Sequence, residues 1–329
     1  MPPIRHAYRA VIRLVGAALI LACLPSIAAA ASPGTNGWYW PTGHSVTSAG
    51  GGWLQYRIYT PGGEAWHVAW DDCGPVHEPV YAAGWGVVDF ADMHVSGYGW
   101  DARQRKTAPG GAIVIKYRTS TGEYFKALYG HLDFREADLP VGSIVRPGQQ
   151  IAVTTAYSTV PHVHFAVHLG PDDPVPLSTP HQYVGMLMGH THEFTLRGST
   201  KVPTTYGFTD PVAFLLTRRP WVAPPASVAT PTVPAAASVR STIRIGGSFA
   251  PTAPAGARNV QLHCEQLVKG TWVRRTTFTG MTVDTGGAAS RYVVSARFIT
   301  PGQWRVRAYF AGDLDLSSAS SGWAYLTVR

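Results

Sequence analysis

Cysteine, charge and long apolar runs are all scarce in this chain of 329 residues. Its three cysteines, Cys23, Cys73 and Cys264, are too few for a disulfide framework. No stretch reaches the roughly 20 apolar residues of a membrane-spanning helix, so we expect no transmembrane segment. No block of Lys and Arg marks a DNA contact, and we expect no nucleic-acid partner. Because only 14% of residues are charged and 45% are hydrophobic, extensive disorder is excluded.

Glycine and proline are abundant, with 35 and 26 residues, which indicates many turns between short elements. The length suggests about two domains. The formal net charge is +8, and it falls to +5 without the three arginines of the N-terminal segment, Arg5, Arg9 and Arg13. This modest positive charge suits anionic surfaces, and we expect anionic wall polymers among the candidate partners.

The N-terminus has the pattern of a secretory signal peptide over residues 1–31. A basic segment, Arg5–Arg13, precedes an apolar run, Leu14–Leu24, and four small residues follow as a cleavage site. We therefore expect a protein that is secreted or located in the cell envelope, in the periplasm or the cell wall. A lipoprotein signal with Cys23 as the lipidated residue is an alternative that the preceding sequence disfavours. After cleavage, Cys73 and Cys264 remain, and they either pair or stay reduced.

The composition changes near residue 220, where we place a domain boundary. Residues 220–239 contain Pro, Ala, Val and Thr without charge, which predicts an extended linker. The following region, 240–329, contains short alternating segments separated by Gly and Pro, which predict a β-sandwich. These segments are 243–245, 260–262, 292–294, 304–309 and 324–328. The segment Tyr309–Asp313 and the final strand resemble the last hairpin of bacterial immunoglobulin-like domains.

The first domain, residues 32–219, also has the pattern of β structure. Its predicted strands are 80–83, 86–88, 112–117, 125–129 and 162–167. Val141-Gly142 and Pro147-Gly148 predict tight turns between strands. No amphipathic helix longer than about ten residues is predicted, and residues 171–209 have no clear assignment.

Histidines are concentrated in this first domain. His162 and His164 are two residues apart on a predicted strand, so both imidazoles lie on one face while Val163 and Phe165 face the core. His67 precedes an aspartate by four residues, so that both side chains could turn onto one ion. Two histidines and a carboxylate leave the fourth tetrahedral position of Zn²⁺ open for water, as a catalytic site requires.

His131 follows an alternating strand and is a further candidate. Each of these motifs is weak alone, and spacing does not decide which of His162 and His164 is the ligand. Asp72 competes with Asp71, although the four-residue spacing favours Asp71.

Four further candidates have simpler interpretations. Cys73 is expected to be a packed thiol or half of a disulfide. His168 is expected in a groove or at the surface, because it lies far along the strand from His162. His190 and His192 repeat the spacing of two and are expected in a solvated loop.

The order of these motifs resembles the lysostaphin-like (LytM-type) zinc metallopeptidase family. The ordered segments are His67–Asp71, Pro79–Val88, Tyr129–Leu132, Gly142–Gln149 and Pro161–Phe165. The resemblance extends from Trp40–Gly43, similar to the opening of the family's domain, to Asp210–Leu215, similar to its end. It departs from the family at Ala69, where glycine is usual, and in residues 154–160, which lack the usual glycines next to the substrate groove. The segment 171–209 resembles an insertion.

The resemblance implies an all-β protein, with an antiparallel β-sheet peptidase domain followed by an immunoglobulin-like β-sandwich. It implies that His67, Asp71 and His164 bind Zn²⁺ and that His131 and His162 are catalytic. The implied activity is hydrolysis of peptide bonds in peptidoglycan stem peptides or cross-bridges. Two alternatives remain: a catalytically inactive wall-binding regulator of the same fold, and an adhesive module with structural histidines.

Overall fold

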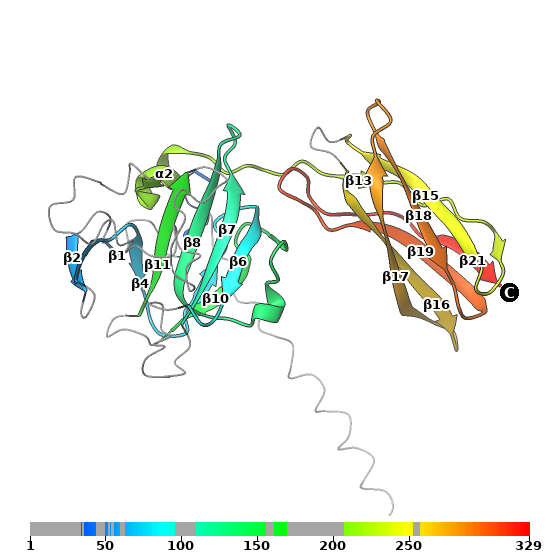
Figure 1. The fold of residues 1–329 in the computed structure, drawn as a ribbon, viewed down its shortest axis with the longest axis horizontal. Coiled ribbons are helices and arrows are strands. Elements are labelled where there is room, and N and C mark those ends of the chain that lie inside the picture. The colour runs from blue at the N-terminus through cyan, green and yellow to red at the C-terminus, as the bar shows by residue number, and fades with distance from the viewer. Residues whose placement is uncertain are drawn as a thin grey trace, which may run out of the picture. The chain divides into compact units, whose positions relative to one another are not determined.

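The computed structural model describes residues 34, 36–43, 50–51, 53, 56–59, 63–95, 110–155, 161–169, 207–252 and 257–329. The predicted signal peptide, 1–31, and the segment 171–206 lie outside the described residues. Nearly all elements are strands in antiparallel sheets (Figure 1), which confirms the prediction of an all-β protein. None of the helices in the described part of the chain has the length and apolar character needed to cross a bilayer.

The first sheet contains ten strands in the order β1-β4-β11-β8-β7-β6-β9, with β10 between β5 and β8 and with β12 beside β11. Its strands are β1 (Gly50–Gly51), β4 (Trp70–Cys73), β5 (Pro79–Tyr81), β6 (Gly86–Asp92), β7 (Gly111–Arg118), β8 (Tyr124–Asp133), β9 (Ile144–Val145), β10 (Gln150–Thr154), β11 (His162–Leu169) and β12 (Phe208–Thr209). The remaining elements of this region are the hairpin β2 (Tyr56–Tyr59) and β3 (Gly63–Trp66), the short 3₁₀ helix η1 (Glu136–Asp138) and the helix α2 (Pro211–Thr217).

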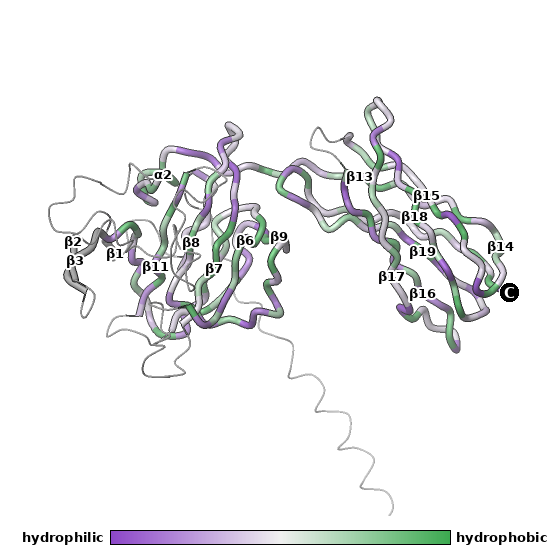
Figure 2. The backbone as a smooth tube through the Cα atoms, in the orientation of Figure 1, coloured by the Kyte–Doolittle hydropathy of each residue, from purple (hydrophilic) through white to green (hydrophobic). Residues whose placement is uncertain are grey.

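Side chains cover both faces of the central strands of this sheet. On one face, Val163 and Phe165 of β11 join the main apolar core, in which Trp40 packs edge-on against Phe165. On the other face, Ala166 joins a smaller cluster with Ala69 and four further buried residues. Burial on both faces explains the apolar run Ala112–Ile115 of β7, which Figure 2 colours as hydrophobic. Strand β8 is buried from Phe125 to Leu132, although it includes the polar residues Lys126 and His131.

The second sheet contains nine strands in the order β13-β15-β18-β17-β16-β19-β21-β14, with β20 beside β19. The strands are β13 (Ser227–Val228), β14 (Ala236–Ala237), β15 (Thr242–Ala250), β16 (Asn259–Val268), β17 (Thr271–Val283), β18 (Ser290–Arg297), β19 (Gly302–Phe310), β20 (Ala319–Ser320) and β21 (Ala324–Val328). The inward residues of β15 and β18 share one apolar core with those of β16, β19 and β21. Phe249 and Phe310 meet across this core with ring centroids 4.9 Å apart. The sheet therefore folds over as a sandwich.

The predicted linker requires a correction. Residues 220–239 are extended in part, but they also supply β13, which pairs with β15, and β14, which pairs in parallel with β21. Val228 is buried in the second core. The second sheet therefore begins inside the predicted linker, because its apolar Val and Ala residues cover edges of the sandwich that would otherwise stay open.

Candidate metal centre

Strand β11 lies between β4 and β8 and aligns the central residues of the candidate site. His164 is the register partner of Asp71 on β4 and of Gly130 on β8. Directly opposed residues on one face of an antiparallel pair have Cβ atoms about 5 Å apart. Strand pairing therefore places a carboxylate beside the imidazole of His164, although 93 positions separate them in the sequence.

His67 completes a compact group with these two residues. It lies in the short segment between β3 and β4, and its Nε2 is 3.1 Å from Asp71 Oδ1 and 3.1 Å from His164 Nδ1. His164 Nδ1 is 3.4 Å from the same carboxylate oxygen. Both imidazoles are almost fully buried, whereas Asp71 is partly exposed. One nitrogen from each histidine and one oxygen thus converge on a common point.

This spacing fits a tetrahedral metal ion. Zn²⁺ binds imidazole nitrogen and carboxylate oxygen at about 2.0–2.2 Å, so two of its tetrahedral ligand atoms are about 3.3 Å apart. The three separations of 3.1, 3.1 and 3.4 Å lie close to that value. Two nitrogens and one oxygen are also a donor set that zinc accepts in catalytic sites, with a fourth position left for water. The residues present therefore fit a zinc ion.

The charge state of Asp71 also suits a ligand. Burial alone raises the pKa of this carboxyl, but hydrogen bonds and positive charge from His164 and His67 outweigh it and hold the pKa far below its usual range. The side chain is therefore an anionic oxygen donor at neutral pH.

Two further imidazoles border this group. His162 Nε2 is 3.6 Å from Asp71 Oδ1, and the His162 ring lies 4.6 Å, centroid to centroid, from the ring of His131. His131 is also 5.9 Å from the ring of His164. The His162 side chain is 16% exposed, whereas the His164 side chain is only 5% exposed. The two outer imidazoles thus lie beside the three candidate metal ligands.

His131 reaches this position through a β-bulge. Ala112 of β7 pairs with Gly130 and Gly111 pairs with Leu132, so the register between the two strands skips His131, which is the extra residue of the bulge on β8. Its φ of 62° is left-handed, a conformation uncommon outside glycine. At the same point β8 ends its pairing with β11 and begins to pair with β10. Bulges of this kind redirect side chains beside functional sites.

The structure separates the competing candidates. Asp72 is fully buried on the opposite face of β4, where Thr42 Oγ1 donates a hydrogen bond to its carboxylate. Cys73 and Cys264 lie in different sheets, and no disulfide joins them.

The expectation for His168 was wrong. Only 2% of it is exposed, because β12 pairs with this end of β11 and Phe208 packs edge-on against the imidazole. Strand β12 lies in the segment 171–209, whose pattern predicts no element, so this cover is not predictable from the sequence. His190 and His192 lie outside the described residues.

A second group of possible ligands, which the sequence reasoning missed, lies at the surface. Asp92, His94 and Glu136 have ligand atoms close together. Both carboxylates of this group accept hydrogen bonds from the backbone. The Met93 N–H donates to Glu136 Oε1 at 2.9 Å, and the His94 N–H donates to Asp92 Oδ1 at 2.7 Å. These contacts shape the end of β6, and the group is much more exposed than the one at His67.

The structure brings together all five residues that the sequence singled out: His67, Asp71, His131, His162 and His164. Three can hold a metal ion and two stand beside it. Comparison of the chain with protein-family models and with curated proteins found no match in either set.

Proposed function

We propose that the protein is an exported zinc metalloendopeptidase that hydrolyses peptide bonds in peptidoglycan stem peptides or cross-bridges. The observation that carries this proposal is the convergence of His67, Asp71 and His164 at the spacing of tetrahedral zinc ligands, with two additional imidazoles alongside. A purely structural zinc site needs no such second pair, because it is closed by its own ligands.

A zinc ion held by His67, Asp71 and His164 would polarise the scissile carbonyl and lower the pKa of water to about 7. The residues of this chain account for the rest of the chemistry. His162 and His131 lie beside the three ligands, where one imidazole can accept a proton from the attacking water. The other can donate a hydrogen bond to the oxyanion that forms at the carbonyl. Proton return to the leaving amine completes hydrolysis.

The substrate class rests on the motif order quoted above and on the predicted signal peptide. Residues 154–160, which lack the glycines usual beside the groove of the family, are expected to change which peptide fits. Export would place the enzyme in the cell envelope or outside the cell, where peptidoglycan lies.

Digestion of purified sacculi tests the proposal. The zinc-loaded protein is incubated with sacculi of several peptide chemotypes, with and without a chelator, and soluble products are identified by mass spectrometry. His131→Ala removes an outer imidazole and leaves the three proposed ligands intact. His94→Ala is the matched control, because His94 is an exposed histidine that follows β6 and belongs to the second, surface group of possible ligands, so this variant also shows whether that group contributes to activity.

We expect fragments with new peptide termini from the protein and from His94→Ala, and none with chelator or from His131→Ala. Binding to sacculi without cleavage of any chemotype would reject the peptidase and support a non-catalytic wall-binding regulator. Neither binding nor cleavage would reject both.

A further inference from the structure

Positive charge is distributed unevenly along the chain. Residues 240–329 contain eleven Lys and Arg against four Asp and Glu, a net charge of +7, whereas residues 34–239 contain thirteen against fifteen. The second sheet therefore carries the excess cationic charge, although the candidate metal centre lies in the first sheet. A concentration of one sign of charge outside the catalytic region indicates a separate electrostatic function.

Three of these eleven cations, Arg274, Arg305 and Arg307, lie on the outward face of β17, β16, β19 and β21. Glu265 of β16 is the register partner of Arg274 on β17 and of Arg305 on β19, and Arg305 in turn faces Tyr325 on β21. Arg305 is neutralised, because its NH2 group is 2.6 Å from Glu265 Oε2. The next row places His263 beside Arg307.

Arg307 and Arg274 remain as cations without an acidic partner in the described part of the chain. Nε of Arg307 is buried without a hydrogen-bond partner, and Arg274 has only a long contact of 3.4 Å to Thr277 Oγ1. Thr277 is the register partner of His263, so the two guanidinium groups flank that histidine.

The positive charge of both arginines affects the pKa of His263, the buried histidine between them. His263 is 8% exposed, and its Nδ1 has no hydrogen-bond partner in the described structure. Burial, together with the positive charge of Arg274 and Arg307, lowers the pKa of His263 to about 4. His263 Nε2 lies 3.2 Å from Gln261 Oε1 and donates to it, so Nδ1 of the neutral ring is an acceptor. The donors that remain for an anion at this spot are those of the two guanidinium groups.

Aromatic rings surround this spot. Arg305 lies between two indoles, 4.7 Å from the centroid of the Trp272 ring and 4.2 Å from that of Trp323, and Arg307 is 4.8 Å from Trp323. Stacking of this kind holds guanidinium groups in fixed orientations. Tyr325, at the margin, is 59% exposed and adds an open aromatic ring.

We propose that this face, named here the arginine–tryptophan face and made of Trp272, Arg274, His263, Arg305, Arg307 and Trp323, binds an anionic polysaccharide. Arg274 and Arg307 would hold one carboxylate or phosphate group over His263, since guanidinium pairs with such groups through two parallel hydrogen bonds. Trp272, Trp323 and Tyr325 would contact the apolar faces of neighbouring sugar rings. The proposal does not depend on the metal centre or on peptidase activity.

The composition of the face favours a glycan over other polyanions. Nucleic-acid binding is driven by many cations, and a protein that makes six to ten phosphate contacts depends steeply on salt. Here only Arg274 and Arg307 lack an acidic partner among the residues of the face. An acidic peptide would use the two cations but not the row of rings beside them.

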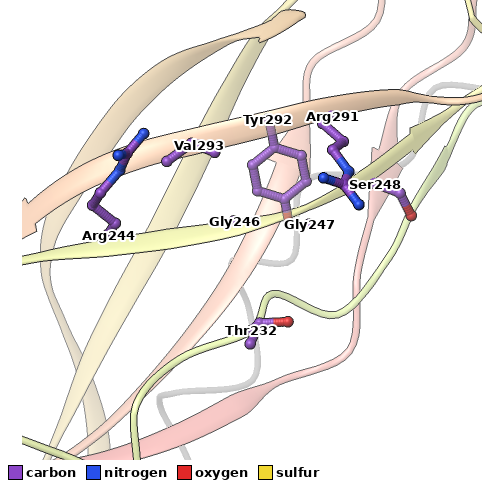
Figure 3. A pocket seen from close by; sticks show the side chains of 8 residues that line it. All are labelled: Thr232, Arg244, Gly246, Gly247, Ser248, Arg291, Tyr292 and Val293. Atoms are coloured by element: carbon purple, nitrogen blue, oxygen red, sulfur yellow. The ribbon is translucent and has the colours of Figure 1, made fainter. Parts of the chain in front are cut away.

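A second pair of arginines provides a matched control. Arg244 of β15 and Arg291 of β18 are exposed, and together with Tyr292, which Figure 3 shows between them, they line a cavity of about 490 Å³. These strands face β16 and β19 across the shared core, so this pair lies on the opposite side of the sandwich. Loss of either pair removes two positive charges from the same sheet.

The test measures binding of the full-length mature protein to immobilised polygalacturonate, neutral dextran, polyglutamate and duplex DNA. We expect binding to polygalacturonate, none to dextran and weaker binding to polyglutamate and DNA. The double variant Arg274→Ala/Arg307→Ala should weaken polygalacturonate binding by about tenfold or more, because charge-assisted hydrogen bonds are lost. Arg244→Ala/Arg291→Ala should change it by less than about threefold, and chelator should have no effect.

Equal losses in the two double variants would overturn the location, because binding would then follow net charge alone. Binding to polyglutamate or to DNA as tight as that to polygalacturonate would overturn the glycan. If a variant does not fold, NMR of the unmodified protein decides: trigalacturonate should shift the His263 imidazole signals, and binding without that shift would reject the face.

Discussion

At the scale of single residues, the candidate centre depends on which way each side chain points from its strand. Asp71 and Asp72 are adjacent and chemically identical, yet strand alternation sends Asp71 to the histidines and Asp72 into the opposite face beside Thr42. Their environments therefore predict different roles, metal binding for Asp71 and stability for Asp72.

The matched variants Asp71→Asn and Asp72→Asn separate these roles. Asp71→Asn removes the anionic ligand, so we expect zinc content after dialysis to fall from about one equivalent to near zero, with little loss of metal-free stability. Asp72→Asn weakens a buried hydrogen bond to a charged acceptor, so the free energy of unfolding should fall by about 1–3 kcal/mol while zinc is retained. Elemental analysis and urea unfolding measure both. Zinc loss in Asp72→Asn alone would contradict the assignment.

The left-handed backbone of His131 leads to a prediction about stability. In that conformation a β-carbon costs about 1–2 kcal/mol, which glycine avoids. His131→Gly should therefore be more stable to urea than His131→Ala by about 1 kcal/mol, although both lack the imidazole and both should be inactive. In an ordinary strand glycine would be the less stable of the two. The reverse order in urea would mean that the bulge relaxes when the imidazole is removed.

At the scale of the element, β16 contains a buried thiol whose ionisation is linked to unfolding. Burial raises the pKa of Cys264 from 9.0 to about 12. The unfolded chain therefore loses this proton first, and the stability contributed by the neutral thiol is full below pH 9 and disappears as the pH rises towards 12. Between pH 9 and 10 the free energy of unfolding should decrease with a slope of up to about 1.4 kcal/mol per pH unit from this group.

Cys264→Ala should remove the part of the pH slope that this thiol contributes to the free energy of unfolding. Cys73→Ala is the control, because it replaces the cysteine of the first sheet and should keep that slope. Urea unfolding at closely spaced pH values measures the difference. An unchanged slope in Cys264→Ala would show that this thiol is not linked to unfolding.

Elements with strict alternation or continuous apolar runs were predictable from the sequence. The final strand was predicted with its observed bounds, and the H-x-H segment was predicted with Val163 and Phe165 inward, where both are fully buried. Strand β17 was missed, because its Thr and Arg residues and Gly280 give a polar pattern; it is held by pairing with β16 and β18. Strands β13 and β14 were missed because two-residue edge strands have no period of their own.

The candidate site was predictable in its residues but not in its construction. Spacing in the sequence favours Asp71 over Asp72, yet it contains no information on the bulge that redirects His131. The bulge arises from a register shift between β7 and β8, which depends on pairing between distant segments. Likewise, the strand that covers His168 is β12, which lies about 40 positions later in the sequence. No local sequence pattern near His168 predicts this pairing.

At the scale of the whole molecule, the two sheets have separate apolar cores and separate proposed functions. The cores around Phe165 and around Val306 share no member, and all proposed metal ligands belong to the first sheet. A ligand that binds only the folded state stabilises the unit that contains its site, by about 2.7 kcal/mol at one hundred times its dissociation constant. Zinc should therefore stabilise one sheet selectively.

Hydrogen exchange followed by mass spectrometry can locate this effect. Chelation should accelerate exchange in β4, β8 and β11, which carry or flank the ligands, and leave β16 and β19 unchanged. Asp71→Asn should exchange like the chelated protein and should not respond to added zinc, which separates loss of metal from other effects of the chelator. Faster exchange in both sheets on chelation would mean that the cores unfold as one cooperative unit, and metal binding in the first sheet would then also support the arginine–tryptophan face in the second.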